Sequence, residues 1–249
     1  MAKEKKVAGK KVPKVPSGPK TPKTPTLTLP VHDVYDALRS VIDGASKDET
    51  RPHLCGVFVR SRAATGTGRG TVEFMTTNAH VLCHWKQAVD DVPDREFTIQ
   101  LDCAKRMVRE LKDVVAEHRA AVKKWEYSGR WKKKDESDPA PEEPKLVFNV
   151  KSYRHDIGTM RLDLSKEPFP NVDPMLTAKM GGRVMSMGIA TAYLALVAKQ
   201  FKIAAKSGTS YAVRMEVQEG KSNLGMMKFS TDRLEAIHLT VYVMPMRID

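Results

Sequence analysis

The C-terminal stretch Tyr242-Val-Met-Pro-Met-Arg-Ile-Asp249 carries the strongest indication of the fold. Val241 to Met244 have the apolar character of a buried strand, and Pro245 ends that strand because proline has no N–H to donate to a ladder. Met244 and Met246, on either side of the proline, have flexible, polarizable side chains that suit a groove able to accept several different peptides. The alternative interpretation is that these last residues form an ordinary frayed end.

Upstream of this end, a unit that starts with a strand and a helix and continues into further strands begins three times. The expected elements are strand 27–30, helix 33–42 and strands 52–60, 71–76 and 80–85; strand 97–100, helix 103–121 and strands 145–150 and 157–164; strand 183–187, helix 190–205 and strands 211–217, 224–229 and 237–243. The third helix is expected to place Leu194, Val197, Ala198 and Phe201 on one side. A recurring β-α-β-β-β unit of about sixty residues indicates an internally repeated fold. The predicted class is α+β, with antiparallel sheets backed by helices.

The composition divides the chain into a tail and two folded regions. Residues 1–26 are rich in Lys and Pro and bury too little apolar area to fold, so a disordered tail is expected, acting as a DNA-phosphate contact or as a solubilising linker. A first domain is expected over 27–177 and a C-terminal half domain over 178–249. Within the first, residues 123–144 are basic and aromatic and then acidic and proline-rich, which indicates an insertion or helix extension followed by a flexible loop.

The charge and the cysteine content limit the possible partners and compartment. The 249 residues have 41% hydrophobic content and a formal net charge of +12. A strong positive charge suggests a polyanionic partner such as nucleic acid. Residues 1–27 hold eight lysines against the single Glu4 and supply over half of that charge. The three cysteines show no disulfide-framework spacing, and no membrane span is expected, so the prediction is a cytoplasmic, nucleoid-associated protein.

No arrangement of residues indicates catalysis or a resident cofactor. His80, Cys83 and His84 include the ligand types that suit zinc, but no second ligand pair follows at suitable spacing, and neighbours on a strand point to opposite faces. Gly66-Thr-Gly-Arg-Gly70 precedes a strand rather than opening a helix, which favours a hairpin loop over a phosphate-binding loop. The expectation is a protein that is not an enzyme and has no cofactor.

Four segments, in order, resemble the bacterial replicative sliding clamp, the beta subunit of DNA polymerase III. They are 46–56, which is similar to the clamp segment between a first helix and the next strand; Met75-Thr-Thr-Asn-Ala-His-Val-Leu82; Phe169-Pro170, which is similar to an interdomain linker; and the C-terminal Met-Pro-Met-Arg. The resemblance covers 27–249 and looks like the middle domain and the second half of the last domain.

The resemblance implies two kinds of binding residue. A groove for partner peptides would involve Leu54, Thr77, Ala79, His80, Leu82, Pro170, Val243, Met244, Pro245, Met246 and Arg247. Contact with duplex DNA would come from helix residues that face the hole of a ring, namely Arg39, Lys105, Arg106, Arg109, Lys112, Lys199, Lys202 and Lys206. Such contact with phosphates alone is sequence-independent and depends steeply on salt. The alternative for these cations is an ordinary solvated helix face.

The leading hypothesis is therefore a sliding-clamp-like processivity factor for DNA replication or repair. It would contact duplex DNA non-specifically, form a homo-oligomer, and bind a DNA polymerase, clamp loader or repair protein through short linear peptides. The alternative is a non-encircling adaptor or decoy that binds the same peptides without acting as a DNA ring.

Overall fold

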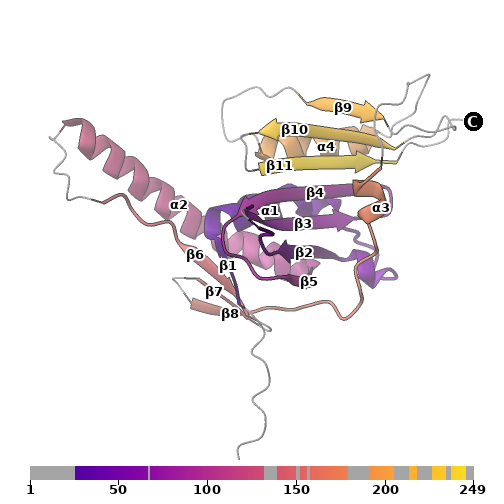
Figure 1. Cartoon of the computed structure of the whole chain (residues 1–249), viewed down its shortest axis with the longest axis horizontal. Coiled ribbons are helices and arrows are strands. Elements are labelled where there is room, and N and C mark those ends of the chain that lie inside the picture. Colours follow the sequence, from indigo (N-terminus) through magenta and orange to yellow (C-terminus); the bar gives the residue numbers. More distant parts are fainter. Residues whose placement is uncertain are drawn as a thin grey trace, which may run out of the picture.

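The computed structural model describes residues 26–66, 68–131, 139–149, 152–155, 158–178, 191–204, 213–217, 226–233 and 237–244. A seven-stranded sheet forms the centre of the molecule (Figure 1). Its strands, from one edge to the other, are β5 (Arg95–Gln100), β2 (Gly56–Arg62), β3 (Gly70–Thr77), β4 (Val81–Val89), β11 (Ile237–Val243), β10 (Met227–Arg233) and β9 (Arg214–Val217). The C-terminal strands thus continue the sheet begun by the first unit.

A second, four-stranded sheet shows how the repeated units interlock. It consists of β1 (Leu27–Pro30), β6 (Lys145–Phe148), β7 (Ser152–His155) and β8 (Gly158–Arg161), in that order. The first strand of each unit pairs with the other unit: β1 joins β6, while β5 joins β2. All described strand pairings are antiparallel.

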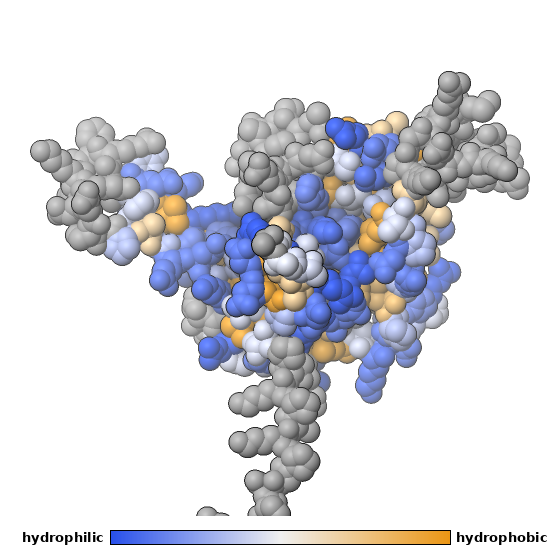
Figure 2. All heavy atoms as spheres, in the orientation of Figure 1, coloured by the Kyte–Doolittle hydropathy of each residue, from blue (hydrophilic) through white to orange (hydrophobic). Residues whose placement is uncertain are grey.

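Helices α1 (Val31–Val41), α2 (Leu101–Trp131) and α4 (Thr191–Ala204) cover one face of the large sheet (Figure 1). Alternation along β3 explains this: Val72 and Phe74 join the main core under the helices, while Glu73 and Met75 face the opposite side. The short helices η1 (Ile42–Gly44), η2 (Pro52–Leu54) and α3 (Asp173–Leu176) complete the described elements. The uncovered face is turned to the viewer in Figure 2, with hydrophilic residues gathered over its centre.

The predicted fold class and most of the predicted elements are confirmed. Gly66, Gly68 and Arg69 of the glycine-rich stretch lie in the connection between β2 and β3, which pair as an antiparallel hairpin, and Gly70 begins β3. The predicted strand 183–187 lies outside the described residues. How far the predicted boundaries of the two domains hold stays a prediction, although β4 and β11 belong to one continuous sheet.

One helix prediction needs correction, and one open alternative is decided. Helix α2 continues to Trp131, so the start of the segment 123–144 is a helix extension, and its last turns project away from the sheets (Figure 1). In α4, Val197 and Phe201 are buried as expected, but Leu194 is 43% exposed and Gln200 is fully buried instead. The face of α4 that packs on the sheet is therefore rotated relative to the predicted one.

Gly56, the first residue of β2, offers a test of the pairing between β2 and β5. A Cβ atom placed there would lie 2.7 Å from the carbonyl oxygen of Ile99, in the backbone of the neighbouring strand. Gly56→Ala is therefore expected to lower the free energy of unfolding by about 1–3 kcal/mol, as overpacking does. Gly158→Ala in β8 is the control, because nothing lies within 4 Å of its added Cβ. Urea unfolding followed by circular dichroism measures both, and equal effects would contradict the assigned close contact.

Candidate functional site

The turn between β3 and β4 is held by its own side chains. The Thr77 hydroxyl donates to the carbonyl of Val81 at 2.8 Å and accepts the N–H of Ala79 at 3.1 Å. The Asn78 side-chain oxygen accepts the N–H groups of His80 and Val81 at 3.0 and 2.9 Å. Ala79 has a φ of 75°, in the left-handed region that non-glycine residues seldom adopt. These bonds keep the turn in one conformation before any ligand arrives.

The C-terminal strand lies directly beside this turn. In the pairing of β11 with β4, Val243 is opposite Val81 and Tyr242 is opposite Leu82. The N–H of Met244 then donates to the carbonyl of His80 at 2.8 Å. This last bond fixes Met244 at the rim of the turn, where its side chain is 41% exposed.

A small apolar cluster forms the base of this region, separate from the main core. It contains Met75, Leu82, Val172, Met226 and Tyr242. Phe58 and Phe169 stack at 4.9 Å between ring centroids and pack against it, so the segment that leads into α3 is anchored on the sheet. On the other side of the turn, the His80 ring stacks on the Tyr193 ring, with 6.1 Å between the ring centroids.

The structure brings together six of the residues predicted for the peptide groove: Thr77, Ala79, His80, Leu82, Val243 and Met244. Leu54 lies in η2 and is buried, and Pro170 is half-buried in the segment before α3. Pro245, Met246 and Arg247 lie outside the described residues. Tyr193 was not predicted, and Leu194 was assigned to the core. An aromatic residue and a leucine at the start of a helix could serve either in binding or in core packing. The sequence alone does not distinguish these two roles.

The predicted DNA-facing cations lie on α1, α2 and α4 but differ in their surroundings. Lys105, Arg109 and Lys112 recur on the exposed side of α2 at a spacing that places them on one face. Lys105 has an ion pair with the neighbouring Asp102 at 3.1 Å, and Lys202 on α4 is exposed.

Other predicted cations have structural partners. Arg106 donates to the Arg161 carbonyl at 2.9 Å and to Asp163 at 3.1 Å, and the bond to Asp163 raises the pKa of Arg106 above its ordinary value. Lys199 lies 2.8 Å from Asp43. Arg39 packs over the ring of Tyr35. Lys206 lies outside the described residues.

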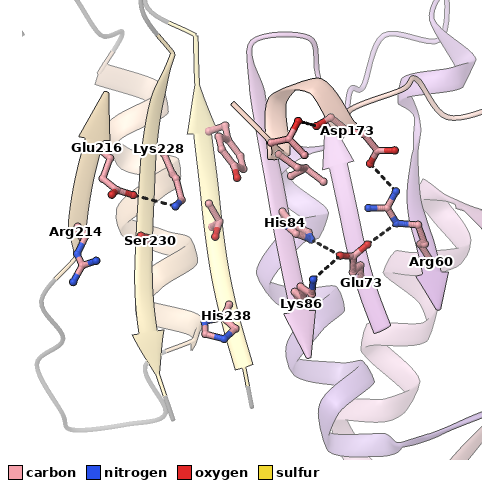
Figure 3. A pocket seen from close by; sticks show the side chains of 14 residues that line it. Arg60, Glu73, His84, Lys86, Asp173, Arg214, Glu216, Lys228, Ser230 and His238 are labelled. Atoms are coloured by element: carbon pink, nitrogen blue, oxygen red, sulfur yellow. Dashed lines mark hydrogen bonds and ion pairs between the residues drawn. The ribbon is translucent and has the colours of Figure 1, made fainter. Parts of the chain in front are cut away.

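The face opposite the helices holds a buried ion network (Figure 3). Glu73 accepts a hydrogen bond from Arg60 at 2.5 Å, and His84 and Lys86 each lie 3.5 Å from its other oxygen. Arg60 also contacts Asp173 of α3 at 2.7 Å. Burial acts to raise the pKa of Glu73, but the hydrogen bonds and positive charges of His84 and Arg60 outweigh it and lower the pKa to about 2. The carboxylate is therefore ionised throughout the physiological range.

The described residues include no cluster of three or more His, Cys, Asp or Glu side chains that could hold a metal ion. Cys83 and His84 point to opposite faces of β4, as predicted, and burial raises the pKa of the Cys83 thiol to about 12. In the same parts of the chain, none of the helices is both long and apolar enough to cross a membrane.

Comparison with known proteins identifies the architecture through structure alone. No protein-family model and no curated protein sequence matches the chain. Among solved structures, the sliding clamp (DNA polymerase III subunit beta) of Bartonella birtlesii bound to griselimycin has a TM-score of 0.59 and 12% identity, over 94% of this chain and 68% of that chain. The griselimycin-bound clamp of Pseudomonas aeruginosa has a TM-score of 0.58 and 13% identity over the same shares. The Borrelia burgdorferi beta subunit in complex with a natural product has a TM-score of 0.58 and 11% identity, over 91% of this chain and 65% of that chain.

Proposed function

Because the chain has the sliding-clamp fold, we propose that it acts as a clamp-like processivity factor for DNA replication or repair. It is a non-enzymatic protein of the cytoplasm that works at the nucleoid. It binds short linear peptides of a DNA polymerase, clamp loader or repair protein, and it contacts duplex DNA without reading sequence. These peptides bind where β4 begins and β11 ends.

One observation carries this proposal: two segments far apart in the sequence meet at one place. They contribute Thr77, Ala79, His80, Leu82, Val243 and Met244. The site combines a rigid turn, an apolar base and an exposed methionine, which are the features that a groove for short peptides requires. Similar clamps were solved with griselimycin or another natural product bound, so the fold accommodates ligands.

Contact with DNA is supported by the exposed cations on α2 and α4. These helices lie on the same side of the large sheet as α1 (Figure 1), so their free faces form one surface. Lysine and arginine side chains on such a surface attract phosphates whatever the base sequence. A homo-oligomer would surround the duplex, because the sequence predicts three of the repeated units in this chain.

The second candidate is a non-encircling adaptor or decoy that binds the same peptides without acting as a DNA ring. The specific observation in its favour is that several cations of the helix side already have carboxylate partners: Arg106 has Asp163, Arg119 has Asp36, and Lys199 has Asp43. Retention on circular duplex DNA that is lost on linearisation separates the two candidates, because only a ring shows it.

Peptide binding is tested by fluorescence anisotropy with a labelled peptide of the Gln-x-x-Leu-Phe type. The full chain is expected to bind in the micromolar range, and Met244→Ala is expected to weaken binding roughly tenfold, as loss of a central apolar contact does. Met215→Ala is the matched control, because Met215 is an exposed methionine on β9, at the far edge of the sheet. Absence of binding by the full chain, or equal weakening by both variants, would contradict a groove at this site.

A further inference from the structure

A cavity of about 490 Å³ lies on the face of the large sheet that the helices leave uncovered, and the proposed clamp activity does not use it. Side chains from β2, β3, β4, β11, β10, β9 and α3 line it (Figure 3). Its volume falls within the range of small-molecule sites, which is about 300–1,000 Å³. The cavity spans the junction between β4 and β11, so a ligand within it would touch both the first unit and the C-terminal strands.

The floor of the cavity is a row of polar side chains across four strands. The register places His84 opposite Thr240, Thr240 opposite Ser230, and Ser230 opposite Arg214. Thr240 and Ser230 are 8% and 9% exposed, and neither hydroxyl has a hydrogen-bond partner among the described residues. The Nε2 atom of His84 is buried beside them and lies 3.5 Å from an oxygen of Glu73. Both hydroxyl groups line the cavity, where they can donate hydrogen bonds to a ligand.

The walls of the cavity carry an excess of positive charge. Its permanent cations are Arg60, Lys86, Arg214 and Lys228, and its carboxylates are Glu73, Asp173 and Glu216. The carboxylates are engaged, Glu73 and Asp173 with Arg60 and Glu216 with Lys228 at 3.0 Å. Among the lining residues, four permanent cations therefore stand against three carboxylates.

We propose that this cavity binds a small phosphate-bearing molecule. The hydroxyl groups of Thr240 and Ser230 donate to the phosphate oxygens, while Lys86 and Lys228 approach from opposite sides. A phosphate group suits the site because it has several acceptor oxygens and takes donors from separate strands at once. Duplex DNA does not fit, because the cavity is small and lies on the face away from the DNA-facing helices.

The experiment is a calorimetric titration of the full chain with inorganic phosphate, with potassium chloride added to constant ionic strength. The wild-type protein is expected to show saturable binding. The double variant Ser230→Ala and Thr240→Val removes both hydroxyl groups without changing the charge, and it is expected to weaken phosphate binding roughly tenfold or more. The control Lys166→Gln removes an exposed positive charge outside the cavity, and it should leave phosphate binding unchanged.

Each outcome decides the proposal. Saturable binding that depends on the two hydroxyl groups and not on Lys166 supports it. Absence of saturable binding at tens of millimolar phosphate overturns it, as does equal binding by the double variant, which would mark an adventitious ion only. Circular dichroism melting of the double variant separates a lost site from a lost fold: a variant that melts early is replaced by Lys228→Gln, for which the same weakening is expected. Peptide binding at Met244 is measured independently, so the two proposals fail separately.

Discussion

Replacement of Glu73 by glutamine is expected to lower the free energy of unfolding by about 3 kcal/mol at pH 7. The carboxylate is 8% exposed and lies on β3 between two neighbouring strands. Arg60 contacts it from β2, and His84 and Lys86 contact it from β4. Its pKa falls from 4.5 to about 2 in the folded protein, and each unit of difference corresponds to about 1.4 kcal/mol. A neutral amide loses that attraction and leaves buried positive charge without compensation.

The same substitution is expected to change the acid sensitivity of the protein. Because folding lowers the pKa of Glu73, its contribution is complete above about pH 4.5 and is lost as the pH falls toward about 2. The wild-type protein should therefore lose stability more steeply than Glu73→Gln across this interval. Urea unfolding at pH 7, at pH 4.5 and near pH 3 measures the difference between the two proteins.

Asp173→Asn provides the matched control for Glu73→Gln. Asp173 is the other carboxylate partner of Arg60, but its side chain is 57% exposed. Ion pairs exposed to solvent contribute about 1 kcal/mol or less, so the loss should be small. Equal losses in the two variants, or parallel acid transitions in wild type and Glu73→Gln, would show that the buried carboxylate does not organise this face.

Neutralising the exposed side of α2 is expected to remove much of the salt dependence of DNA binding. The triple variant Lys105→Gln, Arg109→Gln and Lys112→Gln deletes three potential phosphate contacts. Since each contact contributes about 0.9 to the slope of log affinity against log salt, wild-type affinity should fall roughly fortyfold more than that of the variant between about 50 and 200 mM salt. Anisotropy with a labelled linear duplex measures both slopes.

A second triple variant controls for net charge. Arg51→Gln, Arg62→Gln and Arg69→Gln remove the same number of positive charges, but none of these residues lies on a helix, and each has an ion pair with a carboxylate. Its salt slope should remain close to that of the wild type. If both triple variants lose the same slope, the attraction is a property of overall charge, and the helix face has no special role.

The sequence predicts the elements of this fold better than their partners. Periodicity of two in β3 and β4 shows which side chains share a face, but it does not show that β1 leaves its own unit to pair with β6. The end of α2 was left open between an insertion and a helix extension, because apolar periodicity fades after Ala121 while good helix formers continue to Trp131. In α4, the leucine at 194 was more apolar than Gln200, yet the packing buries the glutamine.

The candidate sites differ in how far sequence could predict them. The residues predicted for the groove came from the resemblance to sliding clamps, in which Thr77 to Leu82 belong to one motif and Val243 and Met244 to another. The network around Glu73 had no such motif. Arg60, Glu73 and Lys86 are ordinary surface residue types in separate strands, and only the register of β2, β3 and β4 places them side by side.

The ladder between β4 and β11 joins parts of the chain that are far apart in sequence, with Val81 opposite Val243. Both the proposed peptide groove and the proposed phosphate cavity are built across it. If β11 separates from β4 in a local opening, the two sites are lost together. A ligand at either site therefore favours the closed form, and thermodynamic reciprocity requires that each ligand strengthen binding of the other to the same degree.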